Sequence, residues 1–154
     1  MLTEKEKNEI EQELEHYPRR DAGGLEALRI VQRHRRWISD QAIQDISDFL
    51  GVTPHQIDSL ATFYNLIFRK PVGSHVILIC DSISCWVKDY NNIVSFLSDQ
   101  LGIGLGETTG DDRFTLLPSP CLGACDRAPV MMVDEDLHVN LTPEKIKKIL
   151  TQYP

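Results

Sequence analysis

Apolar residues recur every three or four positions through the first part of the chain, which is the spacing of an amphipathic helix. This spacing divides the first part of the chain into four helical stretches. Three of them begin at residues that cap helices: Thr3 with Glu6, Ser39, and Thr53 with Pro54. The pattern predicts a first helix of about four turns, a second over 24–37, a third ending at Gly51 and a fourth continuing through residue 68. Residues 1–70 are therefore expected to form a helical bundle.

The pattern changes after a connector at 69–73 that contains Pro and Gly. Residues 75–79 are almost entirely apolar, as expected of a central strand buried on both faces. The elements predicted after it are a helix over 86–101, strands over 114–118 and 129–133, a strand-like segment over 137–141 and a short helix from Thr142. We therefore predict an α+β protein: an N-terminal helical bundle followed, over residues 71–154, by an α/β domain with helices packed on a small mixed sheet.

Composition and charge argue against several classes of function. The 154 residues are 42% apolar and 25% charged, which is typical of a globular protein, and the net charge of -7 argues against nucleic acid as a partner. No apolar run reaches the roughly 18 residues of a membrane span, so no direct membrane insertion is expected. The N-terminal segment is acidic and helical in pattern, unlike a secretory or transit peptide. The chain is therefore expected to be soluble and cytosolic, with reduced thiols.

The four cysteines occur as two pairs. Cys80 and Cys85, separated by four residues, follow the first predicted strand; Cys121 and Cys125, separated by three, lie in a loop between two later strands. Loops of an α/β sheet can converge at one edge, so the four sulfurs can share one site. Because a helix is predicted to start next to Cys85, its thiolate form is expected to be favoured.

Three kinds of site suit these pairs. Disulfides are not expected where thiols stay reduced, whereas four thiolates suit Zn²⁺ or an iron–sulfur cluster. Structural zinc sites commonly have two residues between paired ligands, and neither pair here has that spacing. A [2Fe–2S] cluster takes two ligands on each iron and accommodates wider, unequal spacings, so it is favoured over zinc. A dithiol oxidoreductase is the third alternative, weakened by the missing C-x-x-C motif.

The cysteine pattern occurs together with other short motifs. These are Ala-Thr-Phe-Tyr at 61–64, Arg-Phe-Thr-Leu-Leu-Pro at 113–118 and Leu-Thr-Pro-Glu at 141–144, with 35 residues between the two cysteine pairs. Nearly the whole chain thereby resembles the family formed by the E subunit of bacterial NADH-quinone oxidoreductase (complex I) and the mitochondrial flavoprotein-2 subunit. The resemblance implies a thioredoxin-like C-terminal domain and one [2Fe–2S] cluster, with Cys80, Cys85, Cys121 and Cys125 as its ligands.

The resemblance also implies a role and partners. It places the chain in the peripheral arm of complex I, on the cytoplasmic side of the inner membrane, beside the F subunit, which binds FMN and NADH, and the iron–sulfur G subunit. The implied function is that of an electron-transfer subunit of NADH:quinone oxidoreductase, whose cluster exchanges an electron with FMN and which has no catalytic residues of its own. The alternatives are the equivalent subunit of an NAD-linked hydrogenase or formate dehydrogenase, and a zinc-stabilised interaction module.

Neighbours of the cysteines lead to further expectations. Asp81 and Asp126 directly follow ligand cysteines, and their charge predicts a low reduction potential because it opposes the addition of an electron. The hydroxyl groups of Ser82, Ser84 and Ser119 can donate hydrogen bonds to sulfur, and such bonds are expected to raise the reduction potential. Gly123 is expected to let the backbone curl near the cluster.

Other conspicuous residues have simpler interpretations. Phe63 and Tyr64 are expected in the core or in packing between helices, although aromatic residues also favour interfaces. The basic run at 33–36 is expected to form a solvated face near a helix C-terminus, with contact to an acidic surface of a partner subunit as the alternative. The glycines at 102–106 follow a helix instead of a strand and lack the spacing of a dinucleotide-binding fingerprint, so a loop is predicted there.

Overall fold

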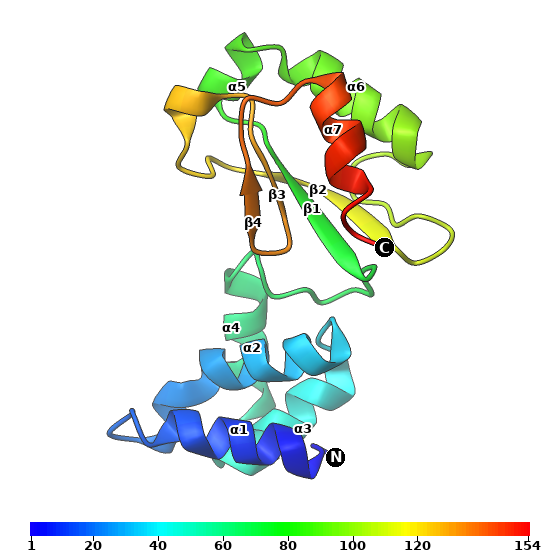
Figure 1. The fold of residues 1–154 in the computed structure, drawn as a ribbon. Coiled ribbons are helices and arrows are strands. Elements are labelled where there is room, and N and C mark those ends of the chain that lie inside the picture. The colour runs from blue at the N-terminus through cyan, green and yellow to red at the C-terminus, as the bar shows by residue number, and fades with distance from the viewer. The chain divides into compact units, whose positions relative to one another are not determined.

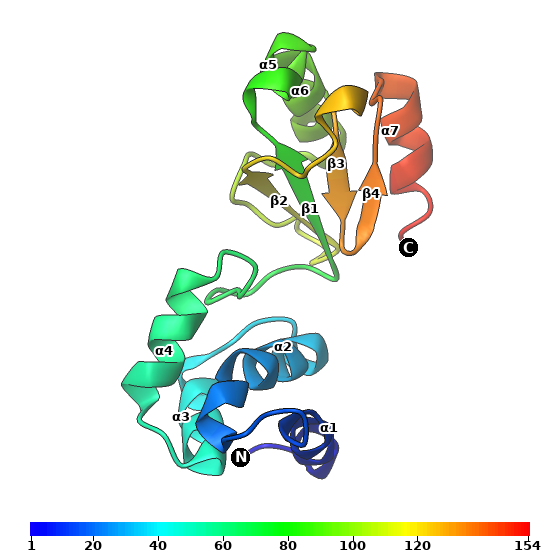
Figure 2. The ribbon, with the colours of Figure 1, turned by 90° about the vertical axis from the view of Figure 1, so that its left-hand side faces the viewer.

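Helices make up the first half of the chain, and a sheet with flanking helices makes up the second (Figures 1 and 2). The computed structural model describes residues 1–154 and separates them into two compact units, Met1–Pro71 and Val72–Pro154. The α+β architecture predicted from the sequence is confirmed.

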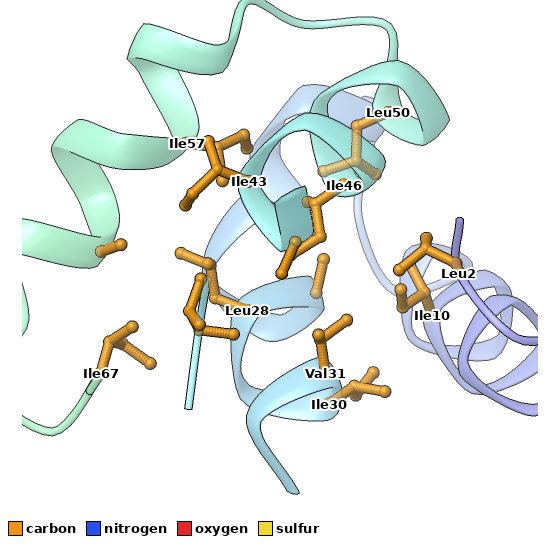
Figure 3. Close-up of a cluster of buried hydrophobic side chains, with 14 of the residues drawn as sticks. Leu2, Ile10, Leu28, Ile30, Val31, Ile43, Ile46, Leu50, Ile57 and Ile67 are labelled. Carbon is orange, nitrogen blue, oxygen red and sulfur yellow. The ribbon is translucent and has the colours of Figure 1, made fainter. Parts of the chain in front are cut away.

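The N-terminal unit consists of α1 (Glu4–Leu14), α2 (Gly24–Arg35), α3 (Asp40–Leu50) and α4 (Pro54–Phe63), with a short 3-10 helix, η1 (Arg20–Gly23), before α2. The predicted caps are present at Thr3, Ser39 and Thr53, whose hydroxyls each accept a backbone N–H of the first helical turn. Apolar side chains from the four helices meet in one core, shown in Figure 3. Burial of this shared face, more than local helix propensity, holds the bundle together.

Helix α4 ends at Phe63, earlier than the predicted end at residue 68. The chain turns back there and is held by the side chain of Gln32 on α2. Its Nε2 donates to the Leu66 carbonyl (2.8 Å), and its Oε1 accepts the Phe68 N–H (2.6 Å). The turn brings Ile67 into the core at 6% exposure. The apolar residues after Phe63 therefore mark a returning loop and not a further helical stripe.

The predicted packing of Phe63 and Tyr64 between helices is wrong. Their exposed fractions are 79% and 40%, and the two rings contact each other edge to face, with centroids 5.1 Å apart. Both residues lie at the turn that returns the chain toward the core, so burial of Ile67 leaves these two aromatic residues outside.

The basic run at 33–36 is not simply a solvated face, because the half-buried Arg35 forms an ion pair with a buried carboxylate. Its Nε and Nη2 donate to the two carboxylate oxygens of Glu6 at 2.6 and 2.7 Å, and Glu6 is only 1% exposed. Hydrogen bonds from Arg35 lower the pKa of Glu6 to about 2, against the opposing effect of burial. The pair ties α1 to the C-terminal end of α2.

In the C-terminal unit the strands lie in the order β2-β1-β3-β4. The central strand β1 (His75–Cys80) pairs in parallel with β2 (Phe114–Ser119) and antiparallel with β3 (Met131–Val133), which pairs with β4 (Asp136–His138). Helix α6 (Tyr90–Leu101) forms the crossover between the parallel strands, and α7 (Pro143–Leu150) packs beside it. A single core joins both helices to Ile77 and Ile79 of β1, so the predicted small mixed sheet is confirmed.

The helix predicted over 86–101 is two helices, α5 (Ile83–Val87) and α6, separated at Lys88–Asp89. Asp89 has a positive φ of 78°, a conformation that interrupts a helix. Val87 is 69% exposed because the break releases it from the register of α6. The predicted loop at 102–106 is confirmed, with Gly102 ending α6 at a φ of 69°. None of the helices has the length and apolar character needed to cross a membrane.

Candidate metal centre

Parallel pairing of β1 and β2 brings the two cysteine loops to the same edge of the sheet. In the register of the two strands, Cys80 at the end of β1 lies opposite Ser119 at the end of β2. The segment after β1 carries Cys85, and the segment after β2 carries Cys121 and Cys125. Two cysteine pairs separated by 35 residues in sequence therefore share one end of the C-terminal unit, as the sequence predicted.

Within each pair, the two thiols lie close together. The sulfurs of Cys121 and Cys125 are 3.3 Å apart, and Cys80 lies close enough to Cys85 to raise the pKa of its thiol. The pairs also lie within electrostatic reach of each other, since a charge on Cys125 acts on Cys85 and a charge on Cys80 acts on Cys125. All four cysteines are free thiols.

The two pairs differ in their exposure to solvent. Cys80 and Cys85 are each 1% exposed and lie in an apolar cluster with Ala124 and Val130. Cys121 and Cys125 are exposed. The site therefore has one side embedded in the protein and one side open to whatever approaches this end of the sheet.

The thiols have different acidities, each with a physical cause. Burial, with a hydrogen bond to Cys80, raises the pKa of Cys85 to about 11. The backbone N–H of Gly123 donates to the sulfur of Cys121 (3.4 Å) and lowers the pKa of that thiol. Hydrogen bonding with Cys121 in turn raises the pKa of Cys125. Converting Cys85 and Cys125 to thiolates therefore calls for a compensating cation, which is what a metal centre supplies.

The expectation that a helix start favours the thiolate of Cys85 is wrong. Cys85 is the third residue of α5 and lies inside it, not before it, and its side chain is buried. Desolvation of the charged form outweighs the dipole of a helix of only five residues.

The donor set consists of two pairs and not of a compact group. No three Cys, His, Asp or Glu side chains converge closely enough to hold one metal ion. A [2Fe–2S] cluster needs two thiolates on each of two irons, and two separate thiol pairs supply that arrangement. Four sulfurs with no nitrogen or oxygen ligand also suit iron–sulfur chemistry. The residues at this edge thus fit such a cluster.

The loops around the cysteines have features that suit ligation. Gly123 has a φ of 81°, the curled backbone expected at this position, and this conformation directs its N–H toward the Cys121 sulfur. The side chains of Ser82 and Ser84 lie near Cys121 and Cys125 respectively, and each acts to lower the pKa of the neighbouring thiol. Asp81 and Asp126 are both exposed, and Arg127 lies 3.6 Å from Asp126.

Sequence reasoning did not identify Val130 as part of this site. Its carbonyl accepts the N–H of Cys80 (3.2 Å), and its side chain is 1% exposed beside the buried thiols. The available signal is the apolar run at 129–133, which by itself indicates only a strand. The strand itself begins at Met131, so Val130 belongs to the wall of the site.

Comparisons with known proteins relate this chain to one family. The sequence model of the family described as thioredoxin-like [2Fe-2S] ferredoxin matches residues 10–154. The chain is 46% identical over 153 residues to the E subunit of the NADH-quinone oxidoreductase of Pseudomonas aeruginosa, covering 99% of this chain and 92% of that protein. It is 49% identical over 152 residues to the protein of the same name in Escherichia coli K12, with the same two coverages.

Solved structures with a similar fold come from an NAD+-reducing [NiFe]-hydrogenase. In its H2-reduced state the TM-score is 0.73 at 23% identity, over 85% of this chain and 22% of the hydrogenase chain. In the air-oxidised state the TM-score is 0.72 at 25% identity, over 86% and 23% of the two chains. The present chain thus spans less than a quarter of the hydrogenase chain, and this likeness concerns the fold.

Proposed function

Because the chain belongs to the thioredoxin-like [2Fe-2S] ferredoxin family, we propose that Cys80, Cys85, Cys121 and Cys125 hold one [2Fe–2S] cluster. The observation that carries the proposal is the convergence of two thiol pairs at the shared end of β1 and β2. Such a cluster accepts and returns one electron at a time. The chain is then an electron-transfer subunit.

We assign one pair of thiolates to each iron. Cys80 with Cys85 forms the buried half, and Cys121 with Cys125 forms the exposed half. Helix α5 fixes Cys85, and the apolar wall around it excludes water from that side. The exposed pair is the side through which an electron partner approaches.

Residues around the sulfurs set the reduction potential in opposite directions. The Gly123 N–H donates to the Cys121 sulfur, and donors of this kind stabilise the more negative, reduced state. Asp81 and Asp126 place carboxylates next to ligand cysteines and oppose reduction. We propose that the carboxylates prevail and that the potential is low, because full charges act at longer range than single hydrogen bonds.

The names of the relatives suggest the setting of the electron transfer. We place this chain in an NADH-quinone oxidoreductase, the complex named in its relatives. We further propose that it exchanges an electron with FMN held by the NADH-binding F subunit and lies near the iron–sulfur G subunit, on the cytoplasmic side of the membrane. A second candidate is the equivalent part of an NAD-linked hydrogenase, because its fold matches at a TM-score of 0.72. Identities of 46% and 49% to the two quinone oxidoreductase proteins, against 25% to the hydrogenase, favour the first.

Purification of the full chain without oxygen tests the cluster. The expected protein is red-brown, contains about two irons and two sulfides per chain, and becomes paramagnetic after reduction with dithionite. Cys121→Ala is expected to abolish these signals and to leave the helical unit folded, whereas Pro120→Ala, next to it in sequence, keeps them. A colourless protein with one zinc per chain, or a normal reduced-state spin signal in Cys121→Ala, contradicts the proposal.

Co-purification from the native membrane tests the parent complex. Recovery with a protein that holds FMN and oxidises NADH, together with membrane-bound quinone reductase subunits, is the expected outcome. Recovery with a nickel-containing or molybdenum-containing subunit replaces the respiratory assignment with the hydrogenase or formate dehydrogenase alternative.

A further inference from the structure

The two thiol pairs differ in how readily an oxidant in solution can reach them. Cys80 and Cys85 are each 1% exposed and belong to an apolar cluster. Cys121 and Cys125 are exposed, and their sulfurs lie 3.3 Å apart. Exposure to solvent is one of the properties that decide which thiols of a protein are oxidised. A dissolved oxidant therefore meets the second pair first.

The geometry of the exposed pair allows one thiol to react with the other. A disulfide has a sulfur–sulfur length of about 2.05 Å, so the two sulfurs need to approach each other by only on the order of 1 Å. The link between them, residues 121–124, belongs to no helix or strand. The space beside Gly123 is open, since a Cβ placed there would meet no atom within 4 Å. The loop can therefore tighten without a steric clash and without breaking regular structure.

We propose that Cys121 and Cys125 form a reversible disulfide when a chain that has not yet received its cluster meets a peroxide, whereas Cys80 and Cys85 stay reduced. The inference rests on the proposed function, because it gives the same two sulfurs a second role as ligands. Sulfurs joined in a disulfide are no longer thiolates, so half of the site is closed to iron until a dithiol reduces the bond. Disulfides of this transient kind, unlike structural ones, occur in proteins whose thiols are otherwise reduced.

The reaction balances with hydrogen peroxide as the oxidant. One sulfur of the pair attacks a peroxide oxygen, the O–O bond breaks, and a sulfenic acid and one water are formed. The neighbouring sulfur then attacks the sulfenic sulfur, so the S–S bond forms while the S–O bond breaks and a second water leaves. Two thiols have then lost two hydrogen atoms, and the peroxide has become two waters. Exchange with a dithiol reverses the change and leaves the disulfide on the reductant.

The nearness of the second thiol decides that the product is a disulfide and not a higher oxide. A sulfenic acid with no thiol in reach can meet another peroxide, which gives a sulfinic acid that dithiols do not reduce. The partner sulfur lies 3.3 Å away and belongs to the same loop, so its attack precedes a second encounter with dilute peroxide. The disulfide therefore preserves Cys121 and Cys125 as ligands that reduction can recover.

Alkylation and tryptic digestion of the full chain test the proposal. The chain is freed of iron with a chelator, reduced, desalted without oxygen and treated with an equimolar amount of hydrogen peroxide, while circular dichroism confirms that it remains folded. Cleavage after Lys and Arg leaves each pair within one peptide, residues 70–88 or residues 114–127. The 114–127 peptide is expected to lose two hydrogen atoms and to resist alkylation at least about tenfold more often than the 70–88 peptide. A dithiol restores both alkylation sites, and oxidation in concentrated urea no longer distinguishes the pairs.

Two variants identify the partner thiol. Cys125→Ser removes it, so Cys121 is expected to progress to a sulfinic acid that a dithiol does not reverse. Cys85→Ser is the matched control, because it removes a buried thiol and is expected to leave the disulfide of the 114–127 peptide unchanged.

The outcomes separate this proposal from the function on which it rests. Equal oxidation of both pairs in the folded chain, a cross-link between the two peptides or between two chains, or free thiols in 114–127 after peroxide overturns the disulfide and leaves the electron-transfer function standing. Equal uptake of iron and sulfide by the oxidised and the reduced chain, without a dithiol, overturns its effect on loading. A fully reduced chain that takes up no iron and sulfide overturns the function itself.

Discussion

Glu6 is almost completely withdrawn from water, and its replacement by Gln tests what the ion pair with Arg35 contributes to the helical unit. Hydrogen bonds from Arg35 and, to a smaller extent, from Thr3 lower the pKa of Glu6 from 4.5 to about 2. A difference of this size corresponds to roughly 3 kcal/mol in favour of the folded state when the carboxylate is ionised in both states. Gln keeps the shape of the side chain but leaves the half-buried guanidinium of Arg35 without a charged partner at this position, and the expected loss at neutral pH is about 3 kcal/mol.

The sign of the pH dependence follows from the direction of the pKa. Because the folded-state pKa of Glu6 lies below the ordinary value of 4.5, the stabilisation is fully present above that pH. It is lost progressively as the pH falls toward 2. Glu6→Gln removes the titrating group, so its stability is expected to vary less than that of the wild type over this range.

Urea unfolding of the full chain measures both effects. The chain has two Trp residues, so in a Trp86→Phe background the fluorescence of Trp37 reports on the helical unit alone. A loss of about 3 kcal/mol is expected to lower the unfolding midpoint by on the order of 1–3 M urea. Glu11→Gln is the control, because Glu11 forms an exposed pair with Arg20 at 2.7 Å and no measurable change is expected. Equal midpoints for Glu6→Gln and Glu11→Gln at pH 7 would refute the reasoning.

Three further substitutions test other contacts. Gln32→Ala removes both hydrogen bonds that hold the returning segment after α4. It is expected to destabilise the helical unit by about 1–3 kcal/mol in the same urea assay. Gln32→Glu keeps an acceptor for the Phe68 N–H and is expected to lose less of the free energy of unfolding. Gly123→Ala forces a side chain into a φ of 81° and is expected to hasten loss of iron from the purified protein, while its helical content stays unchanged. Asp134→Ala removes the acceptor of the Val76 N–H (2.9 Å) and is expected to lower the midpoint of thermal unfolding. Asp134→Asn keeps an acceptor and is expected to unfold at a temperature closer to that of the wild type. Equal midpoints in the two variants would show that this hydrogen bond contributes nothing to thermal stability.

Local signals in the sequence were sufficient to locate most of the secondary structure. The caps at Thr3, Ser39 and Thr53 are side-chain interactions within one helical turn, so they could be identified without knowledge of the fold. The same holds for the apolar run of β1. The shared edge of the cysteine loops followed from the expected α/β arrangement, and the parallel register of β1 with β2 bears it out.

Errors occurred where a contact distant in sequence decided the local structure. The end of α4 depends on the Gln32 side chain, which is more than thirty residues away, and no local pattern records that contact. The ion pair of Arg35 depends in the same way on Glu6 of another helix. The exposure of Trp86 and Val87 depends on the break at Asp89, where a residue other than Gly adopts a positive φ. Helical periodicity alone assigned these residues to one continuous helix.

The crossover between β1 and β2 also determines the order in which the site can be made. A ribosome delivers the β1–α5 segment with Cys80 and Cys85 first, and Cys121 and Cys125 follow only after the whole of α6 and β2 has been synthesised. The first pair alone offers half of the donor set, so a nascent chain has no complete site until β2 pairs with β1. Once filled, the site fastens the two ends of the crossover together, in the manner of a cross-link that closes a long loop. Maturation of this protein is therefore expected to be a post-translational event, and the loaded chain should resist proteolysis between residues 85 and 121 better than the unloaded one.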